Sequence, residues 1–156
     1  MKKTVVGLTG QSGAGKTTIS DAFRENGFEI INCDLVAREV TQAGNECCKE
    51  LAKLFPSCFD ENYSLDRQKL GEIVFSDKNK LQMLNDTIYP FINKLIDEKI
   101  NATESRFILL DAPTLFEAGA DKLCSVIVSV VADFDIRLER ITKRDGISAE
   151  LAKKRF

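Results

Sequence analysis

A glycine-rich loop near the N-terminus constrains this chain more than any other feature. Residues 10–17 read Gly-Gln-Ser-Gly-Ala-Gly-Lys-Thr and fit the phosphate-binding pattern G-x-x-x-x-G-K-[ST] at every fixed position. Glycines allow backbone N–H groups to turn inward around a polyphosphate, while the positive end of the next helix points at it. The loop follows an apolar run at 4–8 and opens a helical pattern at 17–26. The sequence therefore predicts nucleotide binding between a buried strand and a helix.

The side chains at the end of this loop have the chemistry that a metal nucleotide needs. Lys16 supplies a mobile positive charge for the β- and γ-phosphates of ATP. Thr17 supplies a hydroxyl for the Mg²⁺ that bridges those phosphates, and Thr18 can donate to the phosphate nearest the helix start. We expect the rest of the nucleotide-binding loop to be Gly13, Ala14 and Gly15. A plain turn would explain the glycines, but not a Lys-Thr pair in this register.

Two acidic residues follow apolar strand patterns further along the chain. Asp34 comes just after the run at 28–31, so it is expected at the same sheet edge as the phosphate loop, as a candidate catalytic base. It also suits the N-cap of a helix at 35–40, and the two interpretations are compatible. Asp111 follows the apolar run at 106–110. In this position it resembles the Mg²⁺-binding acid of phosphate-loop enzymes. The alternative for Asp111 is a local cap or turn.

The order of strand and helix patterns predicts a three-layer α/β fold with a parallel sheet. A fourth strand is expected at 125–131, and the strand order 2-3-1-4 follows for a fold of this kind. We expect residues 1–156 to form one phosphate-loop domain. Within it, residues of about 60–100 form a helical substrate-binding insertion, broken at Tyr89-Pro90, and about 133–156 form a lid region.

Composition narrows the classes of partner and chemistry. The 22 basic and 24 acidic residues leave a net charge of -2, which gives no broad positive field for nucleic acid. Five cysteines without a C-x-x-C pair suggest reduced thiols in a cytoplasmic protein. The absence of histidine excludes histidine-based catalysis. We find no leader and no apolar run of membrane-spanning length, so no membrane association is expected.

Several further motifs resemble those of the dephospho-coenzyme A kinases, a nucleoside-monophosphate-kinase-like family of phosphate-loop proteins. They span the chain in the family's order. The matching pieces are Gly7-Leu8-Thr9-Gly10, Asp34 with Ala37-Arg38-Glu39-Val40, Leu65-Asp66-Arg67 with Val74-Phe75, Asp111-Ala112-Pro113-Thr114-Leu115-Phe116-Glu117, and Arg140 with Arg144-Asp145. The resemblance implies transfer of the ATP γ-phosphoryl group to the ribose 3′-hydroxyl of dephospho-coenzyme A.

The resemblance also implies roles for individual residues. Asp34 is similar to the acid that takes the 3′-hydroxyl proton, and Lys16 and Thr17 are similar to the phosphate and Mg²⁺ ligands. Arg140 and Arg144 are similar to lid arginines that cover the transferring phosphoryl group. The chain departs from the family at two places, with Asn32 where an acid is usual and Tyr89-Pro90 where a His-Pro pair is usual.

Family members continue with a longer last helix, a fifth strand and a final helix, and we expect this chain to lack those parts. The fifth strand would then be missing beside 125–131, and this apolar edge would favour self-association. Two alternatives stay open at this point. One is another small-molecule or nucleotide kinase of the same fold, and the other is a nucleotide-binding but inactive fragment.

Overall fold

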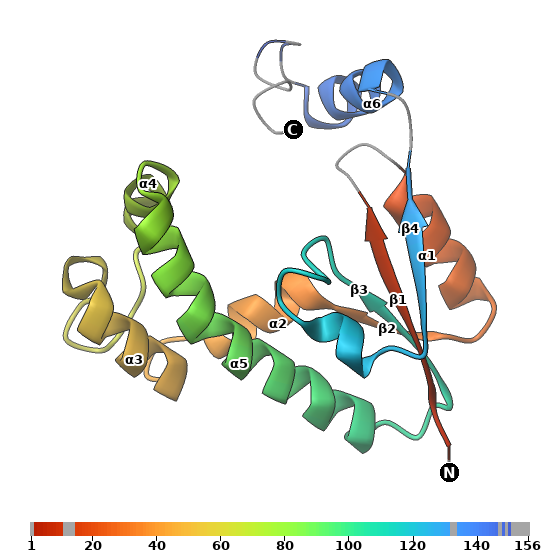
Figure 1. Cartoon of the computed structure of the whole chain (residues 1–156), viewed down its shortest axis with the longest axis horizontal. Coiled ribbons are helices and arrows are strands. Elements are labelled where there is room, and N and C mark those ends of the chain that lie inside the picture. Colours follow the sequence, from red (N-terminus) through yellow and green to blue (C-terminus); the bar gives the residue numbers. More distant parts are fainter. Residues whose placement is uncertain (1, 11–14, 132–133, 147, 149, 151–156) are drawn as a thin grey trace. The chain divides into compact units, whose positions relative to one another are not determined.

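The computed structural model describes residues 2–10, 15–131, 134–146, 148 and 150. The chain divides into two compact units, residues 1–31 with 104–156, and residues 32–103. The first unit contains a four-stranded sheet with helices α1 and α6, and the second is built from helices α2 to α5 (Figure 1). The description of the chain as a single domain with a helical insertion stays a prediction.

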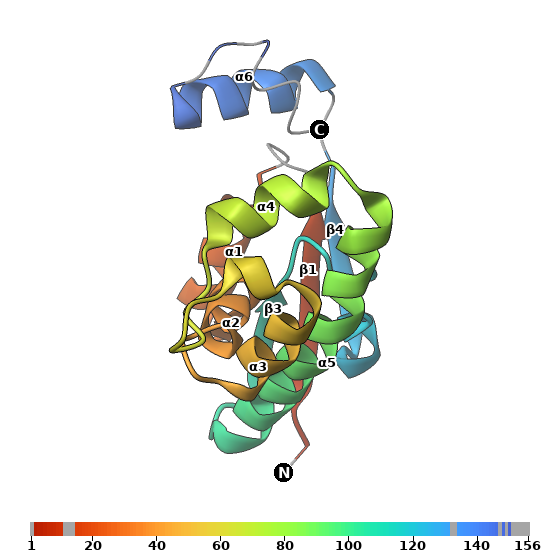
Figure 2. The same cartoon turned by 90° about the vertical axis from the view of Figure 1, so that its left-hand side faces the viewer.

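The sheet has the strand order β2-β3-β1-β4, which confirms the order predicted from the sequence. Its strands are β1 (Thr4–Gly10), β2 (Glu29–Asn32), β3 (Phe107–Asp111) and β4 (Val126–Val130). The central strand β1 pairs in parallel with β3 on one side and with β4 on the other. Figure 2 shows β1 and β4 side by side. The confirmed fold class is α/β, with a parallel sheet.

The sheet in the first unit is covered on one face by α1 (Lys16–Glu25). Ile19 and Phe23 of this helix pack against a buried cluster on the sheet that includes Val6 and Leu8. On the other face, a methyl group at Gly7 would lie 2.8 Å from Cys124 Sγ and 2.9 Å from Leu115 Cδ2. The side chains of Leu115 and Cys124 therefore pack directly on the strand. Burial on both faces explains why the middle of β1 is apolar instead of alternating.

Gly10 allows β1 to approach β4 closely where the phosphate loop begins. A methyl group there would lie 2.7 Å from the carbonyl oxygen of Val130 and 3.3 Å from Lys16 Cγ. The first of these distances is shorter than real Cβ contacts, and a backbone oxygen within a sheet cannot move away easily. Glycine at this position therefore sets the spacing of the two strands at the start of the loop.

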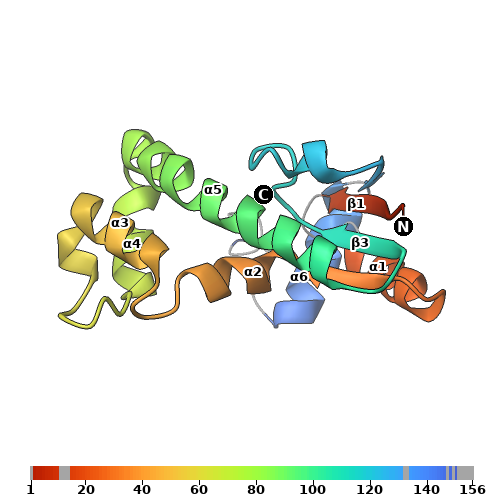
Figure 3. The same cartoon turned by 90° about the horizontal axis from the view of Figure 1, so that it is seen from below.

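The helical unit consists of α2 (Cys33–Val40), α3 (Glu46–Leu54), α4 (Arg67–Phe75) and α5 (Lys78–Ala102). Helix α5 packs against the other three, and Figures 1 and 3 both show it running along them. The remaining helices are α6 (Phe134–Asp145) and the short 3₁₀ turns η1 (Pro56–Cys58) and η2 (Ala120–Leu123). Within the described parts of the chain, no helix is long and apolar enough to cross a membrane.

The sequence-based prediction that a break at Tyr89-Pro90 divides this long helix is wrong. Helix α5 continues through Pro90, although proline has no N–H to donate to the preceding turn. At its N-terminus the side chain of Asp77 accepts hydrogen bonds from the amides of Asn79 and Lys80. Packing against α2, α3 and α4 offsets the loss of one backbone hydrogen bond, because tertiary burial contributes most of a helix's stability.

Candidate phosphate-binding site

Helix α1 begins at the lysine of the glycine-rich loop. Gly15 precedes it with φ 99°, a left-handed conformation that glycine adopts without the strain of a side chain. Lys16 is the first residue of the helix, so its side chain starts where the amide groups of the first turn are free to bind an anion. The next two residues, Thr17 and Thr18, are exposed. The helix start therefore offers backbone donors, a cation and two hydroxyls together.

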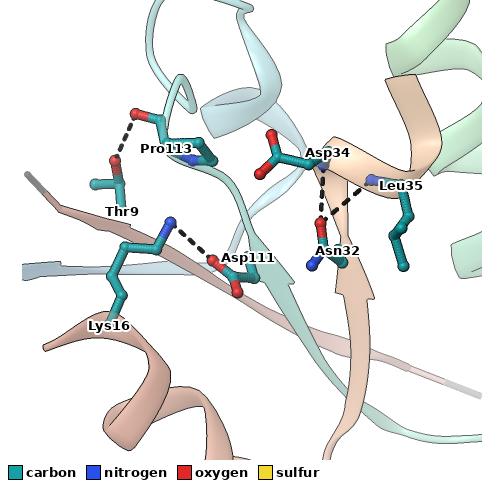
Figure 4. A network of polar contacts seen from close by, with 7 residues as sticks. All are labelled: Thr9, Lys16, Asn32, Asp34, Leu35, Asp111 and Pro113. Atoms are coloured by element: carbon teal, nitrogen blue, oxygen red, sulfur yellow. Dashed lines mark hydrogen bonds and ion pairs between the residues drawn. The ribbon is translucent and has the colours of Figure 1, made fainter. Parts of the chain in front are cut away.

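The lysine is paired with the acid at the end of the neighbouring strand. Lys16 Nζ lies 2.9 Å from Asp111 Oδ1, and each side chain is only 19% exposed. The parallel register of β1 with β3 places Asp111 opposite Leu8, just before the loop begins. Figure 4 shows the ammonium group directed at the carboxylate. The sheet thus brings together two residues that lie far apart in the chain.

Asp111 is suited to hold a hard cation. Its Oδ1 atom is buried and forms no directed hydrogen bond within the described residues, so the Lys16 contact is electrostatic in character. Carboxylate and hydroxyl oxygens are the kinds of ligand with which proteins hold Mg²⁺ on bound phosphates. Where placement is described, the chain has no cluster of three or more acidic or thiol ligands. The residues present fit a metal that is shared with a nucleotide.

A hydroxyl that the sequence reasoning missed ties this edge of the sheet together. Thr9 Oγ1 donates to the carbonyl of Pro113 at 3.3 Å, and the Ala112 amide donates to the carbonyl of Leu8 at 3.0 Å. Thr9 is 8% exposed, so the hydroxyl is buried at the end of β1 (Figure 4). The sequence signal that could have identified Thr9 is a polar residue within an otherwise apolar strand. These bonds hold the segment after Asp111 against the strand that leads into the phosphate loop.

The predicted catalytic base, Asp34, belongs to the helical unit and lies in the first turn of α2. Its proposed second role as the N-cap of this helix is wrong. The cap is Asn32, whose side-chain oxygen accepts from the amides of Asp34 at 2.9 Å and Leu35 at 3.3 Å (Figure 4). An asparagine in extended conformation caps as well as an aspartate does, which explains the shift. The carboxylate of Asp34 is exposed and is not used by the cap.

Some predicted site residues lie outside the described parts of the structure. Gly13 and Ala14 of the loop are among them. Arg140 and Arg144 lie within α6, but their side chains are likewise outside the described set. The roles predicted for these four residues stay predictions.

The five cysteines are free thiols, and three of them lie where ionisation is disfavoured. Burial raises the pKa of Cys47 to about 11, with a smaller contribution from Cys48. Burial likewise raises the pKa of Cys124 to about 11, and the carboxylate of Asp121 adds to the effect. The pKa of Cys48 is also raised, mainly by burial. Because a thiolate is the nucleophile and metal ligand, the raised pKa values keep these thiols protonated at neutral pH and lower their reactivity.

A parallel sheet with a Gly-Lys-Thr helix start, and an acid at the end of the adjacent strand, defines a phosphate-loop nucleotide-binding protein. Residues 4–156 match the family model described as dephospho-CoA kinase. The chain belongs to the dephospho-CoA kinase family.

Individual relatives agree with this assignment. The chain is 36% identical to a dephospho-CoA kinase of Fusobacterium nucleatum, over 99% of this chain and 80% of the relative. It is 34% identical to that of Bacillus licheniformis, over 97% and 78%. Among solved structures, TT1252 from Thermus thermophilus has a TM-score of 0.83 at 30% identity, covering 99% of this chain and 79% of that one. The dephospho-CoA kinase from Campylobacter jejuni has a TM-score of 0.67 at 28% identity, with coverage of 98% and 78%.

Proposed function

We propose that this chain transfers the γ-phosphoryl group of ATP to the ribose 3′-hydroxyl of dephospho-CoA. Members of the family phosphorylate dephospho-CoA with ATP to give CoA. The observation that carries the proposal for this chain is the placement of Lys16 at the start of α1, against Asp111 at the end of β3. The two side chains have the chemistry that phosphoryl transfer needs near a polyphosphate, a cation for the phosphates and a carboxylate for a metal.

Bond making and breaking are simple in this reaction. The 3′-oxygen forms a bond to the γ-phosphorus, the bond from that phosphorus to the bridging oxygen breaks, and ADP leaves. Asp34 accepts the proton of the 3′-hydroxyl, a role that its exposed carboxylate supports because Asn32 provides the helix cap. A positioned carboxylate of this kind contributes roughly 10²–10⁴-fold to the rate.

Positively charged side chains and backbone amides around the transferring phosphoryl group offset its negative charge. Lys16 binds the β- and γ-phosphate oxygens as a point charge, and the amides at the start of α1 bind the adjacent phosphates. Backbone groups of Gly13, Ala14 and Gly15 and the hydroxyl of Thr18 complete the cradle. Arg140 and Arg144 of α6 cover the transferring group, as the family resemblance implies.

Mg²⁺ is the metal that these residues suit, and Thr17 and Asp111 would hold it, directly or through water. The ion would supply positive charge that offsets the negative charge developing on the phosphates. The support lies in the hard oxygen ligands and in the buried Oδ1 of Asp111. Thr17 would contribute a hydroxyl ligand to this ion, and Asp111 a carboxylate ligand.

The proposal is tested by following CoA formation from ATP and dephospho-CoA with the purified chain. We expect ADP release to depend on dephospho-CoA, and CoA to form in equal amount. An acceptor that lacks the 3′-hydroxyl, such as the 3′-deoxy analogue, is the matched control and gives no turnover above background. Release of ADP with a different alcohol, and none with dephospho-CoA, would show that the chain is another small-molecule kinase.

A further inference from the structure

The ion pair between Lys16 and Asp111 has a consequence for how the nucleotide site is filled. The two charged atoms are 2.9 Å apart, and both side chains are about four-fifths shielded from water, with 19% exposure each. Asp111 Oδ1 is buried and is without a directed hydrogen bond among the described residues, so the lysine is its electrostatic partner. The charge that the site needs for phosphates is thus already neutralised within the protein.

A polyphosphate that arrives without a metal meets two obstacles at this pair. It competes with Asp111 for the ammonium of Lys16, and it brings negative charge towards the same carboxylate. Partial burial strengthens both effects, because charges interact more strongly where water is excluded. A divalent cation that arrives with the nucleotide removes both obstacles, since it gives the carboxylate a new partner and leaves the lysine to the phosphates.

We propose that Asp111 makes nucleotide binding conditional on a divalent cation, by holding Lys16 until a metal replaces it. In this chain Asp111 therefore acts as a selector for the metal-bound nucleotide, in addition to any role as a metal ligand. Because binding free energies are coupled reciprocally, the nucleotide also strengthens metal binding through the same pair. This inference rests on the proposed phosphate site at Lys16, and the experiment below separates the two.

The test is equilibrium binding of ATP to the 156-residue chain, measured by calorimetry in EDTA and again in excess Mg²⁺. We expect Asp111→Asn to bind metal-free ATP more tightly than the unchanged chain does, on the order of tenfold. The gain in affinity that Mg²⁺ provides should shrink in the same variant. Asp111→Ala should show the same two changes in ATP affinity, because it also removes the carboxylate. Unlike the asparagine variant, it places no amide beside the lysine.

The matched control is Asp21→Asn, which removes a carboxylate from the exposed face of α1. Asp21 is paired with Arg24 at 2.9 Å, and its side chain is 54% exposed. This variant has the same change in net charge and should keep the affinities of the unchanged chain in both buffers. An equal gain in Asp21→Asn would show a general charge effect and would overturn the proposal.

Two further results would also overturn the proposed selection. One is unchanged metal-free affinity in both Asp111 variants, with only the Mg²⁺-dependent affinity lost, because Asp111 would then be a metal ligand alone. The other is loss of a cooperative thermal transition in both variants, which would make the ion pair a structural contact. A different measurement tests the phosphate site itself. If Lys16→Ala keeps full affinity for ATP in Mg²⁺, the proposed site fails, whatever the Asp111 variants do.

Discussion

At the scale of single residues, two polar side chains at the start of α2, two positions apart, differ in the contacts that they make. Asn32 satisfies the amides of Asp34 and Leu35, and the carboxylate of Asp34 is exposed. We therefore expect Asp34→Asn to lower phosphoryl transfer by roughly 10²–10⁴-fold, because it removes a positioned base. ATP affinity and the thermal midpoint should stay close to those of the unchanged chain. Steady-state kinetics, calorimetry and a melting curve check the three quantities.

The control for this prediction is Asn32→Ala, which removes the cap and leaves the carboxylate. It should lower the free energy of unfolding by about 1 kcal/mol, the usual cost of losing an N-cap. Asn32→Asp should keep most of that stability, since both side chains accept from the same amides. Equal loss of stability in Asp34→Asn would mean that Asp34, too, supports the helix.

The raised pKa values of the buried thiols predict a weakness at alkaline pH. Cys47 and Cys124 each have a pKa near 11 in the folded chain, against 9.0 for an ordinary thiol. Between these two values the unfolded chain loses its thiol protons while the folded chain keeps them, so stability falls as pH rises. By pH 10 each thiol should cost roughly 1 kcal/mol of unfolding free energy.

Denaturant titrations at pH 8 and pH 10 measure this loss. Cys47→Ala should reduce the difference between the two pH values, although it also lowers stability at both by leaving a small cavity. Stability that is constant from pH 8 to pH 10 in the unchanged chain would contradict the assignment. Rapid reaction of Cys47 with a thiol reagent at neutral pH would contradict it as well.

Among single residues, the sequence pattern identified the loop side chains but assigned the cap of α2 to the wrong residue. The lysine and threonines of the loop were identified from spacing alone, because few other patterns place a Lys-Thr pair after a glycine-rich turn. The cap was assigned to Asp34 because asparagine and aspartate cap equally well, so composition could not choose between them. That choice depends on where β2 ends, and it ends at Asn32.

At the scale of elements, the close approach of β1 to β4 depends on Gly10. We expect Gly10→Ala to lower the unfolding free energy by about 1–3 kcal/mol, the range for forcing an extra carbon into a packed region. The obstacle is the Val130 carbonyl oxygen at 2.7 Å, which belongs to the paired strand and cannot rotate away. ATP affinity should fall too, since the loop starts at this residue. Urea denaturation and calorimetry measure the two effects.

Gly71 in α4 provides the matched control. A methyl group there would meet its nearest neighbour, the Phe75 ring, at 3.7 Å, which is an ordinary contact. Gly71→Ala should therefore raise stability by roughly 0.5–1 kcal/mol, as is usual for glycine in a helix interior. If Gly10→Ala were as stable as the unchanged chain, β4 would have to lie further from β1 than the pairing indicates.

Among the elements, the sequence predicted the strands better than the long helix. The inner strands β1 and β3 show as apolar runs bounded by polar residues or glycine, because their burial is nearly continuous. Helix α5 was divided in error because the local preference of proline is strong. The burial of Ile92, Ile96 and Ile100 after Pro90 shows a continuous packed face, which the local pattern around the proline did not reveal.

At the scale of the whole molecule, the sequence predicted the strand order but not the ion pair that this order allows. Lys16 and Asp111 were each identified as site residues, but their ion pair depends on β3 lying directly beside β1. That adjacency is a property of the strand order, which local patterns do not contain. The order itself was predicted because it follows from the recognised fold.

The outer position of β4 in the described sheet leads to a prediction on assembly. Val126 is 53% exposed and Val131, just after the strand, is 77% exposed, with no charged residue between them. Such an edge invites pairing with another chain, so we expect self-association that increases with concentration. Sedimentation velocity measures it, and Val126→Lys should shift the distribution towards the monomer. A chain that is monomeric at every concentration would contradict this expectation.

The central claim is that the lysine at the start of α1 serves phosphoryl transfer to dephospho-CoA. It is tested most directly by measuring CoA formation from ATP and dephospho-CoA with the unchanged chain and with Lys16→Ala. We predict CoA formation by the unchanged chain, and a loss on the order of 10²-fold or more in the variant, since the charge that stabilises the transferring phosphoryl group is removed. Near-normal kcat in a folded Lys16→Ala chain would contradict the claim, because the glycine-rich loop would then be a structural turn.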